Sequence, residues 1–232
     1  MSRVAMLPSR SRLKALVYAR EGVELAVRYA FRQPQGRKVW ITFDDGPHPN
    51  HTTRILDTLH GYQVRATFFW IGKQAERYPE IVQRAVDDGH CLGNHSYSHQ
   101  FLTQLNRTAI YQEIMLADEV LAPYRQNGMK LFRPPHGDHD AIVDQVAEDA
   151  GYQTVMWNCS TRDWSRPFQP YGWVTLGSLL VRMMKSSIVL MHADLPGTAD
   201  HLEKFLDHIK RLDAEFMPPE TLLTAWHSAR VI

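Results

Sequence analysis

Short apolar runs alternate with amphipathic segments along most of the chain, and this alternation restricts the fold more than any other feature. The runs are rich in β-branched and aromatic residues and lack the strict alternation of half-exposed strands; they are 38–43, 66–72, 90–95, 129–135, 152–159 and 187–193. Helical segments are expected at 53–61, 73–88, 107–127, 139–150, 173–186 and 200–213. Repeated strand–helix units predict an α/β fold with a parallel sheet, and six or more units can close into a barrel.

Size, charge and cysteine content narrow the class of protein. The chain has 232 residues, of which 44% are hydrophobic, so one α/β domain accounts for most of it. Lys and Arg number 26 against 25 Asp and Glu, a balance that does not favour nucleic acid as a partner. Cys91 and Cys159 form no C-x-x-C pair, and we expect both to be reduced packing residues.

Residues 1–36 are predicted to form a basic amphipathic arm ahead of the main domain, 37–232. Its apolar residues recur near the helical period, with arginines between them: Leu16, Val23, Val27, Ala30 and Phe31. A helix that closes the barrel bottom is the preferred interpretation, and a membrane-surface helix with peripheral membrane contact is the alternative. The longest apolar run of the arm is too short for a signal peptide or a membrane span, so a cytoplasmic location is expected.

Polar residues gather at the ends of the predicted strands. The first strand ends in two adjacent carboxylates, and later strands are followed by imidazole, guanidinium, carboxylate and indole groups. These residues are Asp44, Asp45, His95, His99, Arg133, Asp163, Trp164 and His192. The carboxyl ends of parallel strands lie on one face of a barrel, which is where barrel enzymes hold their active sites. We therefore expect these side chains to meet.

The segment NHSYSH and the Asp-Asp pair together predict a metal site. His95 and His99 are four residues apart, which would place both imidazoles on one side of a helical turn. Alone, this spacing is more often found in surface histidines. Joined to an aspartate, the two histidines form a two-His, one-carboxylate site with open positions, as catalytic zinc needs. A helix cap or an Asx turn would explain one aspartate at the strand end but not two.

Five segments carry a resemblance to a known family: TFDDGP (42–47), HSYSH (95–99), RPPHG (133–137), STRDW (160–164) and LMH (190–192). In this order and spacing they resemble the polysaccharide deacetylases of carbohydrate esterase family 4, the NodB homology group. The resemblance implies a distorted (β/α) barrel of about seven parallel strands. It also implies a metal-dependent hydrolase that removes N-acetyl groups from N-acetylated sugars, such as chitin oligosaccharide, peptidoglycan or an exopolysaccharide intermediate.

The same resemblance assigns the central roles. Asp44 would be the general base, and Asp45 would bind a divalent metal with His95 and His99. Zinc suits these ligands best, although cobalt, nickel or manganese can use the same set. His192 would protonate the departing amine.

The remaining assignments are supporting ones. Arg133 would orient Asp44, Asp163 would favour the protonated form of His192, and the backbone N–H of His136 would stabilise the oxyanion. Trp164 and Leu190 would shape the acetyl pocket, with simple core packing as the alternative.

Two positions depart from the family pattern, and both bear on the site. Ser160 stands where the family usually has the first aspartate of D-x-x-D-W, and His136 stands where an aromatic residue, commonly Tyr, is usual. Neither change removes a group that the mechanism needs. His136 alters the wall of the sugar site, so substrate preference is where the departure should act.

Two other functions stay open at this point. The same barrel group includes deformylases or deacylases of lipid-linked sugars and hydrolases of small cyclic amides. A non-catalytic sugar-binding module descended from such enzymes would have lost the base or the acid. Asp44 and His192 are both present, which favours the enzyme.

Overall fold

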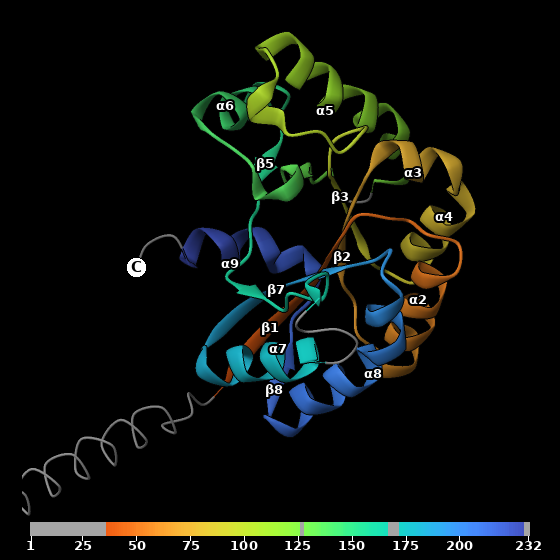
Figure 1. The fold of residues 1–232 in the computed structure, drawn as a ribbon, viewed down its shortest axis with the longest axis vertical. Coiled ribbons are helices and arrows are strands. Elements are labelled where there is room, and N and C mark those ends of the chain that lie inside the picture. Colours follow the sequence, from red (N-terminus) through yellow and green to blue (C-terminus); the bar gives the residue numbers. More distant parts are fainter. Residues whose placement is uncertain (1–35, 126–127, 167–171, 230–232) are drawn as a thin grey trace, which may run out of the picture. The chain divides into compact units, whose positions relative to one another are not determined.

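The computed structural model describes residues 36–125, 128–166 and 172–229. Within these ranges, parallel strands form one sheet in the order β5-β4-β3-β2-β1-β7-β6, and β8 pairs with β1 off this path (Figure 1). The strands are β1 (Arg37–Asp44), β2 (Thr67–Trp70), β3 (Cys91–Asn94), β4 (Leu131–Phe132), β5 (Gln153–Thr154), β6 (Cys159–Ser160), β7 (Ser186–His192) and β8 (Ala214–Phe216). The prediction of a distorted barrel of about seven parallel strands is confirmed.

Helices cover the sheet, and neighbouring helices pack against one another. They are α2 (His51–Tyr62), α3 (Gly72–Arg77), α4 (Pro79–Asp87), α5 (Arg107–Leu121), α6 (Ala141–Asp149), α7 (Gly172–Met183), α8 (Pro196–Arg211) and α9 (Leu222–Ala229). α8 contacts α2 and α7, and α5 contacts α3 and α6 (Figure 1). Asp140 caps the N-terminus of α6, because its carboxylate accepts hydrogen bonds from the N–H groups of Ile142 and Val143.

The structure differs from the predicted elements in a few places. The helix expected at 73–88 is two helices, because Tyr78 is not helical and Pro79 starts a new helix at its first position. The apolar run 152–159 contains β5 and the first residue of β6 rather than one strand. β8 and α9 were not predicted, since neither carries a strong periodic pattern.

The side chains on the two faces of β1 lie in different surroundings. Val39, Ile41 and Phe43 belong to the main hydrophobic core, which also contains buried residues of α2, α4, α7 and α8. The alternate positions, Trp40, Thr42 and Asp44, point to the other face, because side chains alternate along a strand. β7 pairs in register with β1, so that His192 lies opposite Asp44. Two of the predicted catalytic groups are thereby adjacent at the carboxyl ends of two central strands.

The arm predicted for residues 1–36 lies, apart from Gly36, outside the described residues. Its helix, its membrane contact and the cytoplasmic location stay predictions. None of the helices in the described ranges combines the length and the apolar character that a membrane crossing requires. Cys91 and Cys159 are free thiols, as predicted, and burial raises their pKa values to about 11 and about 12.

Candidate active site

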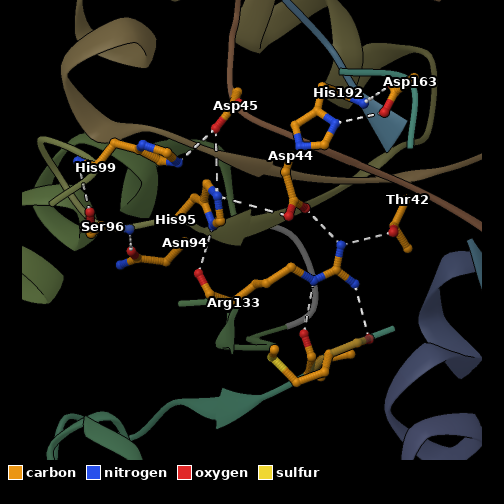
Figure 2. Close-up of polar contacts among 12 residues, drawn as sticks. Thr42, Asp44, Asp45, Asn94, His95, Ser96, His99, Arg133, Asp163 and His192 are labelled. Carbon is orange, nitrogen blue, oxygen red and sulfur yellow. Dashed lines mark hydrogen bonds and ion pairs between the residues drawn. The ribbon is translucent and has the colours of Figure 1, made fainter. Parts of the chain in front are cut away.

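The strand ends surround a cavity of about 420 Å³ at the carboxyl face of the sheet. Eight of the ten predicted site residues line it: Asp44, Asp45, His95, His99, His136, Trp164, Leu190 and His192. The other two, Arg133 and Asp163, lie behind this lining and contact Asp44 and His192, as Figure 2 shows. The sequence prediction that these side chains meet is therefore correct.

Asp44 is held by a fully buried arginine. The Nη1 atom of Arg133 donates to Asp44 Oδ1 at 2.7 Å and to Thr42 Oγ1 at 2.9 Å (Figure 2). Two further donors of the guanidinium reach the backbone carbonyls of Val155 and Met156. A guanidinium with this many fixed partners has one orientation, so it fixes the carboxylate of Asp44 as well.

Below the ion pair, Arg133 stacks on an aromatic ring. Its guanidinium carbon lies 4.0 Å from the centre of the Phe69 ring. Burial lowers the pKa of Arg133, and the charge of Asp44 opposes that effect. Arg133 and Asp44 thus form a buried, hydrogen-bonded ion pair. Removing one partner of such a pair is strongly destabilising, because the other charge is then buried without a partner.

A second cluster, next to Asp44, consists of Asp45, His95 and His99. Asp45 Oδ1 lies 3.0 Å from His99 Nε2 and 3.6 Å from His95 Nε2. Asp45 has a φ of 63°, and this left-handed backbone conformation follows the extended residue Asp44. Burial by itself raises the pKa of the Asp45 carboxyl, but the imidazoles of His99, His95 and His192 hold it well below its ordinary value.

The two histidines come together in a way that the sequence did not predict. Residues 95–99 form a loop after β3 and not a helical turn, and Ser96 and His99 have φ values of 60° and 61°. The Ser96 hydroxyl accepts a hydrogen bond from the backbone N–H of His99 at 3.0 Å (Figure 2). Spacing predicted the meeting of the imidazoles correctly, while the expected local structure was wrong.

His192 and Asp163 form the third contact. The Nδ1–H of His192 donates to Asp163 Oδ1 at 2.9 Å, and the backbone N–H of His192 donates to Asp163 Oδ2 at 2.8 Å. Thr198 donates to the same Oδ2 at 2.7 Å, so the carboxylate cannot rotate freely. Burial lowers the pKa of His192, but the carboxylates around it, Asp163 first and then Asp45 and Asp44, more than offset this and raise it to about 9. His192 is therefore in its imidazolium form at neutral pH.

Comparisons with known proteins agree with this constellation. Residues 31–155 match the family model described as polysaccharide deacetylase. The chain belongs to this family. A relative from Bacillus cereus named peptidoglycan-N-acetylglucosamine deacetylase is 33% identical over 194 residues, which are 82% of this chain and 70% of the relative.

A second relative and a solved structure extend the comparison. The chitooligosaccharide deacetylase of Bradyrhizobium sp. is 32% identical over 173 residues, or 74% of this chain and 78% of the relative. The family 4 carbohydrate esterase from Streptomyces lividans, solved in complex with acetate, superposes with a TM-score of 0.70 at 30% identity, covering 78% of this chain and 91% of that chain. The predicted family, fold and enzyme class are thereby confirmed.

The ligand atoms of the enzyme fit a divalent metal. One such atom each from Asp45, His95 and His99 lies within 4.8 Å of the others. Bonds of about 2.1 Å at tetrahedral angles hold two ligand atoms roughly 3.4 Å apart, and the observed 3.0 and 3.6 Å lie on either side of that value. Asp45 Oδ1 is buried and accepts no hydrogen bond within the described residues, which leaves it available to a cation.

The tautomer of His95 supports the same reading. Its Nδ1 lies 2.6 Å from the carbonyl oxygen of Arg133, which can only accept, so Nδ1 carries the hydrogen and Nε2 offers a lone pair. Burial lowers the pKa of His95, against the opposing charges of Asp44 and Asp45, and this favours a neutral imidazole. Metal-binding histidines in proteins are usually held in this way through their second nitrogen.

Aromatic rings stand around the cavity. Trp164 is 46% exposed and meets His192 edge-on, with ring centres 5.0 Å apart. His136 has a φ of 60°, stacks on Phe101 at 3.9 Å and meets His99 edge-on at 4.4 Å. Trp164 lines the cavity while remaining partly exposed, and a residue that served only core packing would be buried.

Leu190 and Ser160 complete the account of the predicted residues. Leu190 is buried, and its position in β7 makes it part of the cavity wall. Ser160 pairs with Leu190 across β6 and β7, and its hydroxyl is buried without a hydrogen bond in the described residues. The carboxylate that contacts His192 Nδ1 comes from Asp163 and not from position 160, so the change to Ser160 leaves that contact intact.

Some functional residues escaped the sequence analysis. Thr42 contacts Arg133, and Thr198 contacts Asp163, but both lie in ordinary strand or helix sequence. Trp157 and Asp194 line the cavity. Asp194 follows His192 by two residues, and this closeness was the available signal. Burial raises the pKa of Asp194.

A larger cavity, of about 640 Å³, lies near the opposite ends of β1 and β7. Lys38, Lys185 and Ser186 line it together with residues of α9 and the segments around them. Among the described residues, none of those that line it carries a carboxylate or an imidazole. Size alone would favour this cavity, but the groups needed for hydrolysis are all in the smaller one.

Proposed function

We propose that this enzyme is a metal-dependent N-deacetylase of N-acetylated sugars in oligo- or polysaccharides, releasing acetate. The observation that carries the proposal is the arrangement around one cavity of a fixed carboxylate, a protonated imidazole and a set of metal ligands. Hydrolysis of an acetamide needs a base for the water and an acid for the amine, because an unprotonated amine is a poor leaving group.

Asp44 is the base. Its Oδ1 is occupied by Arg133, while Oδ2 lies 3.8 Å from His95 Nε2 at the cavity. Because the guanidinium occupies Oδ1, Oδ2 is the oxygen that can accept the proton of the attacking water. Arg133 itself does not touch the cavity and acts by orienting Asp44.

His192 is the acid. It lines the cavity, and the proton on its Nδ1 is held by Asp163, which leaves Nε2–H to donate to the nitrogen of the departing amine. The C–N bond then breaks, and the amine leaves with the proton. Acetate keeps the oxygen of the water, so the products are a free amino sugar and acetate.

Asp45, His95 and His99 would hold the divalent ion, for which zinc suits the ligands best and cobalt, nickel or manganese are alternatives. When bound, such an ion supplies Lewis acidity toward the acetamide carbonyl and the attacking water. The backbone N–H of His136 is proposed as a hydrogen-bond donor to the oxyanion, and Leu190 and Trp164 as the walls around the acetyl methyl group.

The substrate class is drawn from the relatives. Two of them are named for peptidoglycan N-acetylglucosamine and for chitooligosaccharide, so an N-acetylglucosamine unit within a longer glycan is the substrate proposed here. His136, in place of the family's usual aromatic residue, stacks on Phe101 at the cavity wall. That pair is where a preference for one sugar over another would arise.

The test measures acetate release from N-acetylglucosamine oligomers, peptidoglycan fragments and a panel of other acylated sugars. Metal-stripped protein is compared with and without zinc or cobalt, beside Asp44→Asn. We expect metal-dependent release that Asp44→Asn reduces by at least two orders of magnitude, in line with the usual contribution of a general base. Activity only on formylated lipid-linked sugars or small cyclic amides would replace the proposed substrate, and metal-independent release would refute the assigned site.

A further inference from the structure

The loop that carries the two histidine ligands does not hold its shape by itself. Ser96 and His99 both have left-handed backbone conformations, which are unfavourable for residues other than glycine. Such a conformation persists only where surrounding groups fix it. The question is which groups these are.

Every backbone N–H of residues 95–99 has an acceptor. His95 donates to the carbonyl of Trp70, Ser96 to the Asn94 side chain and His99 to the Ser96 hydroxyl. These three acceptors lie in the loop itself or in the strands next to it. The other two N–H groups, at the centre of the loop, have a more distant acceptor.

That acceptor is Glu113, in the middle of α5. Its Oε2 accepts from the N–H groups of Tyr97 at 3.1 Å and Ser98 at 2.8 Å. Its Oε1 accepts from the Ser98 hydroxyl at 2.7 Å and from Gln100 Nε2 at 3.2 Å. One carboxylate thus receives four hydrogen bonds from three residues of this segment, Tyr97, Ser98 and Gln100.

Burial makes this arrangement informative. Glu113 is only 8% exposed, and no lysine, arginine or histidine of the described residues forms an ion pair with it. A buried carboxylate is costly unless hydrogen bonds replace its water. Within the described residues, the hydrogen bonds to Glu113 come from Tyr97, Ser98 and Gln100, so the carboxylate and the loop stabilise each other.

We propose that Glu113 is a positioning residue for the metal site: it holds the 95–99 loop so that His95 and His99 face Asp45. The inference rests on the proposed metal site and deepens it. A second contact from α5 acts in the same direction, because Asn94 Nδ2 donates to the carbonyl of Ile114 at 2.9 Å. Groups that orient metal ligands in this way contribute to metal affinity without touching the ion.

Two substitutions of Glu113 differ in what they remove. Glu113→Gln keeps the shape and one carbonyl oxygen for the two backbone N–H groups, but its amide N–H₂ replaces the oxygen that accepts from the Ser98 hydroxyl and from Gln100 Nε2, so neither bond can form as before. Glu113→Ala removes every bond to the loop. Glu119→Gln, at an exposed position of the same helix, is the matched control.

The experiment titrates zinc into the metal-stripped full chain and measures the dissociation constant by competition with a chromogenic chelator. We expect zinc to bind about 10-fold more weakly to Glu113→Gln and about 100-fold more weakly to Glu113→Ala, the usual range for such groups, with no change in Glu119→Gln. Raised zinc should restore the turnover of Glu113→Gln. A misfolded protein would instead lose binding sites and would not regain turnover.

The outcomes separate the two ideas. If both Glu113 variants melt earlier in the metal-free form but bind zinc within twofold of the wild type, Glu113 is only a stabilising residue and the inference is wrong. If Glu113→Ala does not fold, the same criterion applies to Glu113→Gln. If the wild type itself fails to bind one zinc per chain, or if Asp45→Ala binds it equally well, the proposed metal site fails instead.

Discussion

Replacing Asp163 by asparagine should turn off the acid without disturbing the rest of the cavity. The side chain keeps its shape, and its carbonyl oxygen can still accept from the backbone N–H of His192 and from Thr198. What changes is the contact with Nδ1, which now faces an N–H₂ group. That group favours a neutral imidazole with its hydrogen on Nε2, a far weaker acid than imidazolium.

The size of the effect follows from the pKa of His192. Its rise from an ordinary 6.5 to about 9 corresponds to roughly 3 kcal/mol in favour of the protonated form, and Asp163 is the first of the carboxylates that raise it, ahead of Asp45 and Asp44. Without the charge of Asp163, the pKa of His192 should fall below 9, because burial then meets less opposition. Loss of a general acid usually costs about 10²- to 10⁴-fold in rate, and we expect kcat of Asp163→Asn to fall within that range at neutral pH.

The assay is the pH dependence of acetate release, with wild type and variant at the same saturating zinc concentration. In the wild type, the protonated acid is lost as the pH rises through the pKa of His192, so activity falls on the alkaline side. In Asp163→Asn this fall should begin at lower pH. A folded variant whose alkaline limb coincides with that of the wild type would refute the reasoning; Asp200→Asn, at an exposed aspartate of α8, controls for loss of a carboxylate as such.

The same shift affects stability, and its sign can be stated. A pKa raised in the folded state adds stability that is fully present below about pH 6.5 and is lost as the pH rises through about 9. Asp163→Asn removes this contribution. The stability difference between wild type and variant should therefore be largest in mild acid and become smaller toward pH 9, as urea unfolding at several pH values would reveal.

Two further substitutions test the packing behind the base. Arg133→Met leaves the carboxylate of Asp44 buried without its partner and should destabilise the fold by about 3–5 kcal/mol in urea unfolding; a cost below 1 kcal/mol would contradict the buried pair. Gly93→Ala places a methyl group 2.3 Å from the Phe69 ring, on which Arg133 stacks. This substitution should lower the free energy of unfolding by about 1–3 kcal/mol and lower kcat. Its control, Gly61→Ala, adds a methyl group in open space on α2 and should raise the free energy of unfolding by about 0.5–1 kcal/mol. Equal effects of the two alanines would refute the crowding at Gly93.

Much of the active site could be predicted because its chemistry demands particular residue types at particular places. Hydrolysis of an acetamide needs a base, an acid and polar ligands, and parallel strands bring their carboxyl ends to one face. A list of polar residues at strand ends was therefore nearly a list of the site. The resemblance carried by the five segments added roles to residues such as Arg133 and Asp163, whose types alone are common in any protein.

Local structure was less predictable where distant groups override local preference. The spacing of His95 and His99 suits a helical turn, yet Glu113 of α5 and the start of α3 hold the segment as a loop. Gly72 shows how close this packing is, since a Cβ there would lie 2.9 Å from Ala117 of α5 and from Tyr97. Contacts between elements this far apart leave no periodic signal in the chain.

The amino-acid sequence by itself determined the alternation of most strands and helices, the parallel sheet and the set of groups available for catalysis, because hydrophobic period and residue chemistry are local properties. The family resemblance assigned different roles to the two adjacent aspartates, but only the tertiary structure gives the physical reason for the difference. Asp44 ends an extended strand and meets Arg133, whereas Asp45 turns through a left-handed conformation toward the histidines. Their surroundings come from β4 and the loop after β3, and only folding brings these segments to the same strand end.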